Sequence, residues 1–267
     1  MAAECTLHVE RGGAGERLLV LLHGLGANSA VWRRLIPILD ERWQDRWIAP
    51  DFRGHGRSPY EGPYGYAAHA ADIAALIGAE DGGGITLLGH SFGGVVAALV
   101  GTGWYGPRVR EVLAFGVKIE WTEDEVGKAR ELALRPARTF ATHGDAASRY
   151  LKMSGLHGLI DPASPDAAAG VKTLADGFQV AMDPRAYGAV GPSIETILRR
   201  CAAPVRLAAG ARDPMVAAEA MRRIDPGAVT FEGVDHNVHW KAPEQVWNFI
   251  AATAIRQTND TKRQMSR

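Results

Sequence analysis

A serine enclosed by glycines, between a strand-like and a helix-like segment, is the feature that most constrains this chain. Residues 85–88 are largely apolar, as in a buried strand, and residues 95–100 are small and apolar, as in a packed helix. Ser91 stands between them, with Gly89 and Gly93 two positions away on either side. In a G-x-S-x-G turn the serine adopts a strained conformation that exposes its Oγ atom. A helix cap is the simpler explanation, but the strand before and the helix after favour a nucleophile.

Composition excludes several classes of function. The chain has 267 residues, with 30 basic and 30 acidic side chains, so its charge favours neither nucleic acid nor anionic lipid as a partner. The two cysteines, Cys5 and Cys201, cannot form a disulfide framework and indicate a reducing compartment. No signal-peptide core or membrane-spanning run is present in the sequence. We therefore expect a soluble cytoplasmic protein whose partner is a small-molecule substrate; the oligomeric state is not readable.

Strand-like and helix-like segments alternate along most of the chain. Such alternation predicts an α/β fold with a mostly parallel central sheet flanked by helices. We assign residues 1–118 and 201–258 to this core, and residues 259–267 to a flexible tail.

The alternation stops in residues 119–200, which we predict to be a helical cap inserted between two strands. Thr122 and Glu125 form the pattern of a capping box at the start of one helix. Residues 145–155 and 164–182 are predicted as further helices, the second with Pro165 in its first turn. We expect this apolar cap to overhang Ser91 and to leave a partly enclosed, largely hydrophobic pocket there.

A serine needs a base, an orienting acid and oxyanion donors before it acts as a nucleophile. Asp213 follows an apolar strand-like segment, and His236 follows the next one. Either residue alone could be ordinary, Asp213 as a helix cap before Pro214 and His236 as a surface histidine. Together with Ser91 they stand in the order nucleophile, acid, base, at the strand ends where an α/β sheet gathers its functional groups.

Five segments give the chain a resemblance to the α/β-hydrolase fold superfamily, specifically to serine hydrolases of the esterase and lactonase-like group with a helical cap. They are LLHGLGAN (21–28), APDFRGHGRS (49–58), GHSFGG (89–94), GARDP (210–214) and DHNVHWKAPEQV (235–246). The resemblance covers the core on both sides of the insertion. It implies an α/β-hydrolase fold with a Ser-His-Asp triad.

The resemblance also implies a role for each matched residue. Ser91 is the expected nucleophile, His236 the general base and Asp213 its orienting carboxylate. The backbone N–H groups of Leu25 and Phe92 are expected to form the oxyanion hole. No cofactor and no metal ion is expected.

We expect hydrolysis of a small or medium carboxylic ester through an acyl-enzyme, with a lactone or thioester as related substrates. Two alternatives stay open: a C–C bond hydrolase or cofactor-free perhydrolase with the same triad, and a non-catalytic small-molecule receptor. Serine at position 91, where some relatives carry aspartate, argues against haloalkane dehalogenase or epoxide hydrolase chemistry.

Two assignments within the site have competitors. Glu120 also follows a strand-like segment, at a position where some members of the family carry their acid. His239 lies in the same segment as His236 and is the competing base, but His236 is preferred because it directly follows its strand. The two histidines could also bind a metal ion, but such a site would lack a third ligand nearby in sequence. The family often has an acidic residue five positions after the catalytic histidine, whereas this chain has Lys241.

Residues that could line the substrate pocket are drawn from the cap and from the histidine segment. The candidates are Trp121, Met153, His239 and Trp240. Aromatic and methionine side chains are common in apolar pockets, although in a cap they can equally form its own core.

Overall fold

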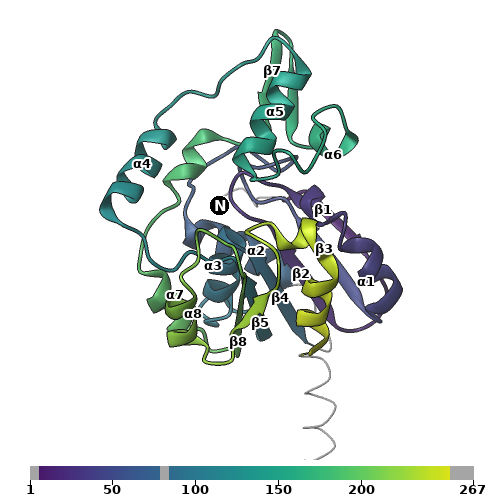
Figure 1. The fold of residues 1–267 in the computed structure, drawn as a ribbon, viewed down its shortest axis with the longest axis vertical. Coiled ribbons are helices and arrows are strands. Elements are labelled where there is room, and N and C mark those ends of the chain that lie inside the picture. Colours follow the sequence, from purple (N-terminus) through teal and green to yellow (C-terminus); the bar gives the residue numbers. More distant parts are fainter. Residues whose placement is uncertain (1–5, 79–83, 253–267) are drawn as a thin grey trace, which may run out of the picture.

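The computed structural model describes residues 6–78 and 84–252. A seven-stranded sheet lies at its centre, with the spatial order β1-β3-β2-β4-β5-β8-β9 (Figure 1). β1 pairs antiparallel with β3, and every other neighbouring pair is parallel, which confirms the predicted α/β class. The antiparallel edge strand β1 was not predicted. The strands are β1 (Val9–Gly12), β2 (Leu18–Leu22), β3 (Arg46–Pro50), β4 (Ile85–His90), β5 (Val109–Phe115), β8 (Val205–Gly210) and β9 (Val229–Phe231).

Helices cover both faces of the sheet, as the alternating buried residues of β2 show. Leu18, Val20 and Leu22 pack with α2 (Tyr66–Gly78), α3 (Phe92–Val100), α7 (Ile194–Arg200) and α8 (Ala218–Ile224). Leu19 and Leu21 pack with the 3₁₀ helix η1 (Ser29–Trp32), α1 (Ile36–Arg42) and a helix over residues 243–252. Successive residues of a strand point to opposite faces. A strand that is apolar at every position is therefore buried on both sides, as β2 is.

The inserted segment contains both helices and strands. Figure 1 shows α4, α5, α6 and β7 gathered in the upper part of the view, while α7 and α8 lie in the lower part. The elements of the insertion before α7 are α4 (Glu123–Ala133), α5 (His143–Met153), α6 (Pro165–Ala168), β6 (Val171–Leu174), β7 (Gly177–Val180) and the 3₁₀ helix η2 (Pro184–Gly188). Outside the insertion, the later histidine segment forms the short helix α9 (Val238–Lys241). The Thr122–Glu125 capping box begins α4, as predicted.

The helix predicted over 164–182 is wrong: after the four residues of α6 the chain forms a hairpin of β6 and β7. Two glycines account for the difference. Gly170 lies against the ring of Tyr150, where an added Cβ would stand 2.1 Å from Cγ of the ring. Gly177 has a φ of +151°, which a helix does not accommodate. The dipeptide Asp176-Gly177 was a readable hairpin signal.

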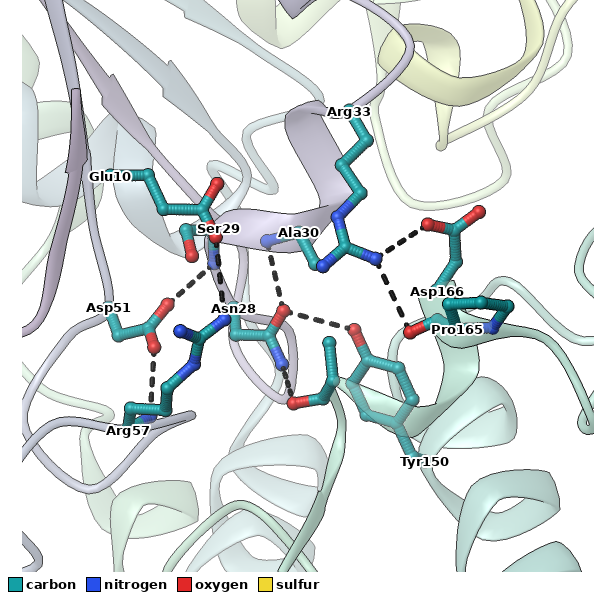
Figure 2. A network of polar contacts seen from close by, with 11 residues as sticks. Glu10, Asn28, Ser29, Ala30, Arg33, Asp51, Arg57, Tyr150, Pro165 and Asp166 are labelled. Atoms are coloured by element: carbon teal, nitrogen blue, oxygen red, sulfur yellow. Dashed lines mark hydrogen bonds and ion pairs between the residues drawn. The ribbon is translucent and has the colours of Figure 1, made fainter. Parts of the chain in front are cut away.

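A polar network ties this hairpin segment to the core (Figure 2). Asn28, just before η1, donates its amide to the carbonyl oxygen of Ala169 at 2.8 Å, and its own oxygen accepts from the hydroxyl of Tyr150 at 3.5 Å. Beside it, Arg33 forms an ion pair with Asp166 at 2.7 Å. The same Asn28 oxygen caps η1 by accepting from the N–H of Ala30. One buried side chain therefore holds a core turn and the inserted segment together.

The limits of the inserted segment stay a prediction. Its last predicted helix, α7, packs against α3 and α8, and its apolar side chains belong to the core cluster. The predicted tail over 259–267 lies outside the described residues. Among the residues that are described, no helix combines the length and the apolar character needed to cross a membrane.

We predict that a methyl group at Gly93 disrupts the fold, whereas one at Gly127 stabilises it. A Cβ on Gly93 would stand 2.2 Å from the carbonyl oxygen of Leu22 in β2. We expect Gly93→Ala to lower the free energy of unfolding by about 3 kcal/mol or more. Gly127, inside α4, has nothing within 4 Å of its Cβ position, so Gly127→Ala should add about 0.5–1 kcal/mol. Urea unfolding followed by circular dichroism measures both; equal midpoints for Gly93→Ala and the parent would contradict the close approach.

Candidate active site

Ser91 lies at the turn between β4 and α3 with φ 50° and ψ −115°. It is the one non-glycine residue with positive φ within residues 6–78 and 84–252. Its hydroxyl makes no capping hydrogen bond to α3, so the simpler helix-cap interpretation does not hold. The strained backbone is held by two hydrogen bonds: the N–H of Ser91 donates to Phe115 in β5 at 2.8 Å, and its carbonyl accepts from Gly94 at 3.0 Å.

The glycines around Ser91 permit three backbones to approach closely. A Cβ on Gly89 would lie 2.4 Å from the carbonyl oxygen of Gly93, and one on Gly94 would lie 2.5 Å from a methyl group of Val117. With Gly93 against β2, the turn leaves no room for side chains at these positions. Side chains at Gly89 and Gly93 would therefore collide with the neighbouring backbone of this tight turn.

His236 and Asp213 are brought together by the loops after β9 and β8. Nδ1 of His236 donates to Oδ2 of Asp213 at 2.8 Å, and the side chain of Asp213 is fully buried. The other carboxylate oxygen accepts from the N–H of Met215 at 2.9 Å, which fixes the carboxylate plane. Because Nδ1 carries the proton, Nε2 of His236 is left with its lone pair. Glu120, the competing acid, instead pairs with Arg223 on the surface.

His90 connects the serine turn to the histidine loop, a role that the sequence did not reveal. Its Nε2 donates to the backbone carbonyl of His236 at 3.1 Å, and the two ring centroids are 4.6 Å apart. Burial lowers the pKa of His90 well below its usual value, so the ring is neutral and carries one N–H. His90, which directly precedes Ser91, thus fixes the backbone of His236, whose ring is bonded to Asp213.

The loop after β2 is shaped by two more buried histidines. His55 accepts the N–H of Gly26 on Nε2 at 3.2 Å and donates from Nδ1 to Arg53 at 3.1 Å. His23 donates from Nδ1 to the carbonyl oxygen of Gly24 at 2.8 Å and accepts the N–H of Phe52 at 3.0 Å. Burial lowers the pKa of His23 to about 4, so it too is neutral.

These bonds leave two backbone N–H groups free beside Ser91. The Gly26 N–H is occupied by His55, whereas that of Leu25 has no acceptor among the described residues. The N–H of Phe92 is the first of α3, where a helix supplies no acceptor of its own. Both residues line the same cavity as Ser91. They are the pair that the sequence resemblance indicated as oxyanion donors.

A cavity of about 350 Å³ opens over Ser91 and is lined mainly by apolar side chains. His236 lines it from the core, and the predicted pocket residues Trp121, Met153 and His239 line it as well. Trp240 does not, which corrects that assignment. Its ring is buried, and the guanidinium of Arg34 stacks on it at 5.6 Å. Adjacent residues of a helix point in different directions. His239 and Trp240 are adjacent in α9, so they do not reach the same wall of the cavity.

His239 is packed at the inner wall of this cavity among Trp32, His90 and Phe115. Only 1% of its surface is exposed, and neither ring nitrogen has a hydrogen-bond partner. No carboxylate of the described residues is bonded to it, whereas His236 is bonded to Asp213. Of the two histidines in the segment, only His236 has the partner that a base requires.

Lys241, the departure from the family pattern, forms an ion pair with Asp235. This pair closes the loop that carries His236, so the loop has local support of its own. Within the described residues, no group of three or more His, Cys, Asp or Glu side chains is arranged to hold a metal ion.

One protein-family model matches most of the chain. The model of the Alpha/beta hydrolase family matches residues 19–249. This range begins at the second residue of β2 and includes every later strand of the sheet, so β1 lies outside it. The matched range contains Ser91, Asp213 and His236.

Individual relatives are similar over different lengths. The 2-(acetamidomethylene)succinate hydrolase of Mesorhizobium japonicum is 29% identical over 262 residues, 92% of each chain. Lipase LipV of Mycobacterium tuberculosis is 39% identical over 92 residues, and this match spans 34% of each chain. A crystal structure of E-2-(acetamidomethylene)succinate hydrolase superposes with a TM-score of 0.77 at 25% identity, covering 93% of this chain and 96% of that one.

We predict that His239 makes the protein less stable in acid. Burial lowers the pKa of His239 to about 3 from 6.5, its ordinary value, which we take for the unfolded chain. Between these values the unfolded state binds one proton more, so the contribution of His239 is complete above about pH 6.5 and is lost as the pH falls.

Urea unfolding of the parent and of His239→Leu at about pH 5.5 and 4.5 measures how the free energy of unfolding changes with pH, and so whether His239 takes up a proton on unfolding. The variant should lose less stability on acidification, by about 1.4 kcal/mol per pH unit. Removing an unsatisfied buried polar group should also leave it at least as stable as the parent at neutral pH. Identical pH slopes for the two proteins would show that His239 takes up no proton on unfolding.

Proposed function

The chain belongs to the alpha/beta hydrolase family and is a hydrolase, and we propose that it cleaves small or medium carboxylic esters through a serine acyl-enzyme. One observation carries the proposal. Ser91, held at a positive φ, and His236, bonded to the buried Asp213, line the same cavity. Acyl transfer requires a nucleophile, a base beside it and an acid that orients the base.

In the first step His236 accepts the hydroxyl proton of Ser91 on Nε2 while Oγ attacks the carbonyl carbon. Asp213 holds the imidazole in the required tautomer through the 2.8 Å bond and stabilises the charge that forms on it. The N–H groups of Leu25 and Phe92 donate to the oxyanion. His236 then gives the proton to the leaving group.

In the second step water hydrolyses the acyl-enzyme. His236 removes a proton from the water as its oxygen attacks the acyl carbon, and returns the proton to Oγ of Ser91. The same two N–H groups stabilise the second oxyanion. The free acid then leaves, and the enzyme regains its starting state.

The cavity favours an apolar acyl group of modest size. Its volume of about 350 Å³ is at the small end of the range for ligand pockets. No Asp or Glu side chain lines it among the described residues, so no fixed negative charge opposes an electron-rich carbonyl. Esters, thioesters and lactones share this carbonyl chemistry, and we place carboxylic esters first among them.

We predict that Ser91→Ala loses about a million-fold in turnover of an aryl ester, because the nucleophile and base act as a unit. A fluorophosphonate probe should label the parent once, at Ser91. Ser154→Ala is the matched control: this hydroxyl lines the same cavity but donates to the carbonyl of Tyr150 at 3.0 Å. Labelling should persist in Ser154→Ala, and activity of Ser91→Ala within ten-fold of the parent would overturn the mechanism.

We predict that His90 positions the base His236, and that it does so through the hydrogen bond that its Nε2 donates to the carbonyl of His236. Glutamine at position 90 can place an amide N–H near the carbonyl of His236, whereas leucine cannot. We expect His90→Leu to lower kcat by about ten- to a hundred-fold, since a small misplacement of a catalytic group has effects of this size. His90→Gln should stay within about three-fold of the parent. Equal losses in both variants would mean that His90 only fills space.

A further inference from the structure

A second cavity, also of about 350 Å³, lies in the inserted segment next to the one over Ser91. Met153 and Tyr187 line both cavities, so the two share a wall. The rest of the second cavity is formed by the end of α4 and the loop after it, by α5, and by β7 with the residues that follow it.

Three arginines line this second cavity: Arg135, Arg138 and Arg149. No Asp or Glu belongs to its described lining, and none of the three forms an ion pair within residues 6–78 and 84–252. Other cations of the same segment do have carboxylate partners, such as Arg185 with Asp183 and Lys128 with Asp124, both at 2.6 Å. All three side chains are exposed to solvent, and Arg138 also stacks on the ring of Phe140 at 4.8 Å. Three cations around one cavity attract an anion from solution.

The arginines are connected to the catalytic cavity along α5. Arg149 and Met153 are four residues apart on this helix and therefore lie on one face. Arg149 also acts electrostatically on the hydroxyl of Tyr187, the other shared residue: burial raises the pKa of that phenol and Arg149 opposes the rise. Lys152 lines the first cavity and has no carboxylate partner within the described residues. Positive charge thus extends from the arginines to the cavity of Ser91.

We propose that the arginine cavity binds the phosphate or diphosphate group of a phosphorylated leaving group, while the acyl carbonyl lies at Ser91. The proposal rests on the acyl-transfer function, and adds that among the esters, thioesters and lactones that share this carbonyl chemistry the arginine cavity selects thioesters of a phosphorylated thiol. Coenzyme A provides the probe. Three guanidinium groups match the several oxygens of a phosphoryl group, which accept two parallel hydrogen bonds from each fork. A ligand with a single carboxylate would neutralise only part of the positive charge of the three arginines.

The reaction balances without any further reactant. Oγ of Ser91 forms a bond to the acyl carbon as the C–S bond breaks, and the thiolate takes the proton that His236 had accepted. Water then hydrolyses the acyl-enzyme, giving a carboxylic acid and a thiol. The arginines hold the departing thiol's phosphates and take no part in the bond changes.

The test compares two thioesters with the same scissile bond, butyryl-coenzyme A and the butyryl thioester of N-acetylcysteamine, which has no phosphate. We expect the parent to prefer the coenzyme A ester by about ten-fold or more in kcat/KM. Arg138→Gln and Arg149→Gln should each lower kcat/KM for that ester by about ten-fold, mainly through KM. Hydrolysis of the N-acetylcysteamine ester should stay within two-fold. Added salt should raise KM for the coenzyme A ester alone.

Arg130→Gln is the matched control, since Arg130 is an exposed arginine of α4 that lines neither cavity. It should change neither ester's kinetics. Equal kcat/KM for the two esters in the parent, or equal effects of the three substitutions, would overturn the phosphate site and leave the acyl-transfer function standing. Failure of the parent to hydrolyse either thioester or an aryl ester would instead overturn the proposed function itself.

Discussion

The close approach of three backbones at the serine turn is the constraint on which the rest of the structure depends. Gly93 at the start of α3 lies against the carbonyl of Leu22 in β2, and Gly89 in β4 lies against Gly93. This packing brings α3 onto one face of the sheet, over its central strands, and forces Ser91 to a φ of 50°. The strain of that residue is balanced by hydrogen bonds to Phe115 and Gly94. The exposure of the serine hydroxyl is thus a result of packing.

Neutral buried histidines set the loops around that turn. His23, His55 and His90 are each held in one tautomer by backbone partners, and burial lowers the pKa of each. A neutral imidazole both donates and accepts, so it can join two backbone segments without burying a charge. His236 differs from them in having a buried carboxylate, that of Asp213, as its partner. Neighbouring histidines therefore divide into three that hold loops through backbone hydrogen bonds and one, His236, that is bonded to a carboxylate.

The inserted segment completes the site from the other side. Asn28 fixes it to the loop between β2 and η1 through Ala169 and Tyr150, as Figure 2 shows. The loop that carries Leu25 and the wall that carries Met153 are therefore coupled by buried hydrogen bonds. A substrate that fills the cavity contacts both, so its fit depends on this contact between core and insertion.

The sequence by itself determined the parallel core and the residues at its strand ends, because these follow from local patterns. The glycines of the serine turn, the apolar strands and the order of Ser91, Asp213 and His236 are all readable over a few residues each. The choice of Asp213 over Glu120 and the link from His90 to His236 depend on which strand ends lie side by side. The position of Trp240 away from the cavity also depends on how the chain packs in three dimensions.

Only the tertiary structure decided these points, and the hairpin of β6 and β7 is the clearest example. Residues 171–180 carry enough helix-forming side chains to read as a helix, yet Gly170 is pressed against Tyr150, and Phe140 pairs with Phe178. Contacts between residues far apart in the chain outweighed the local preference there. The same holds for the arginine cavity, whose arginines come from the loop after α4 and from α5. Each charge is visible in the sequence, but their convergence, with no carboxylate in the described lining, exists only in the folded chain.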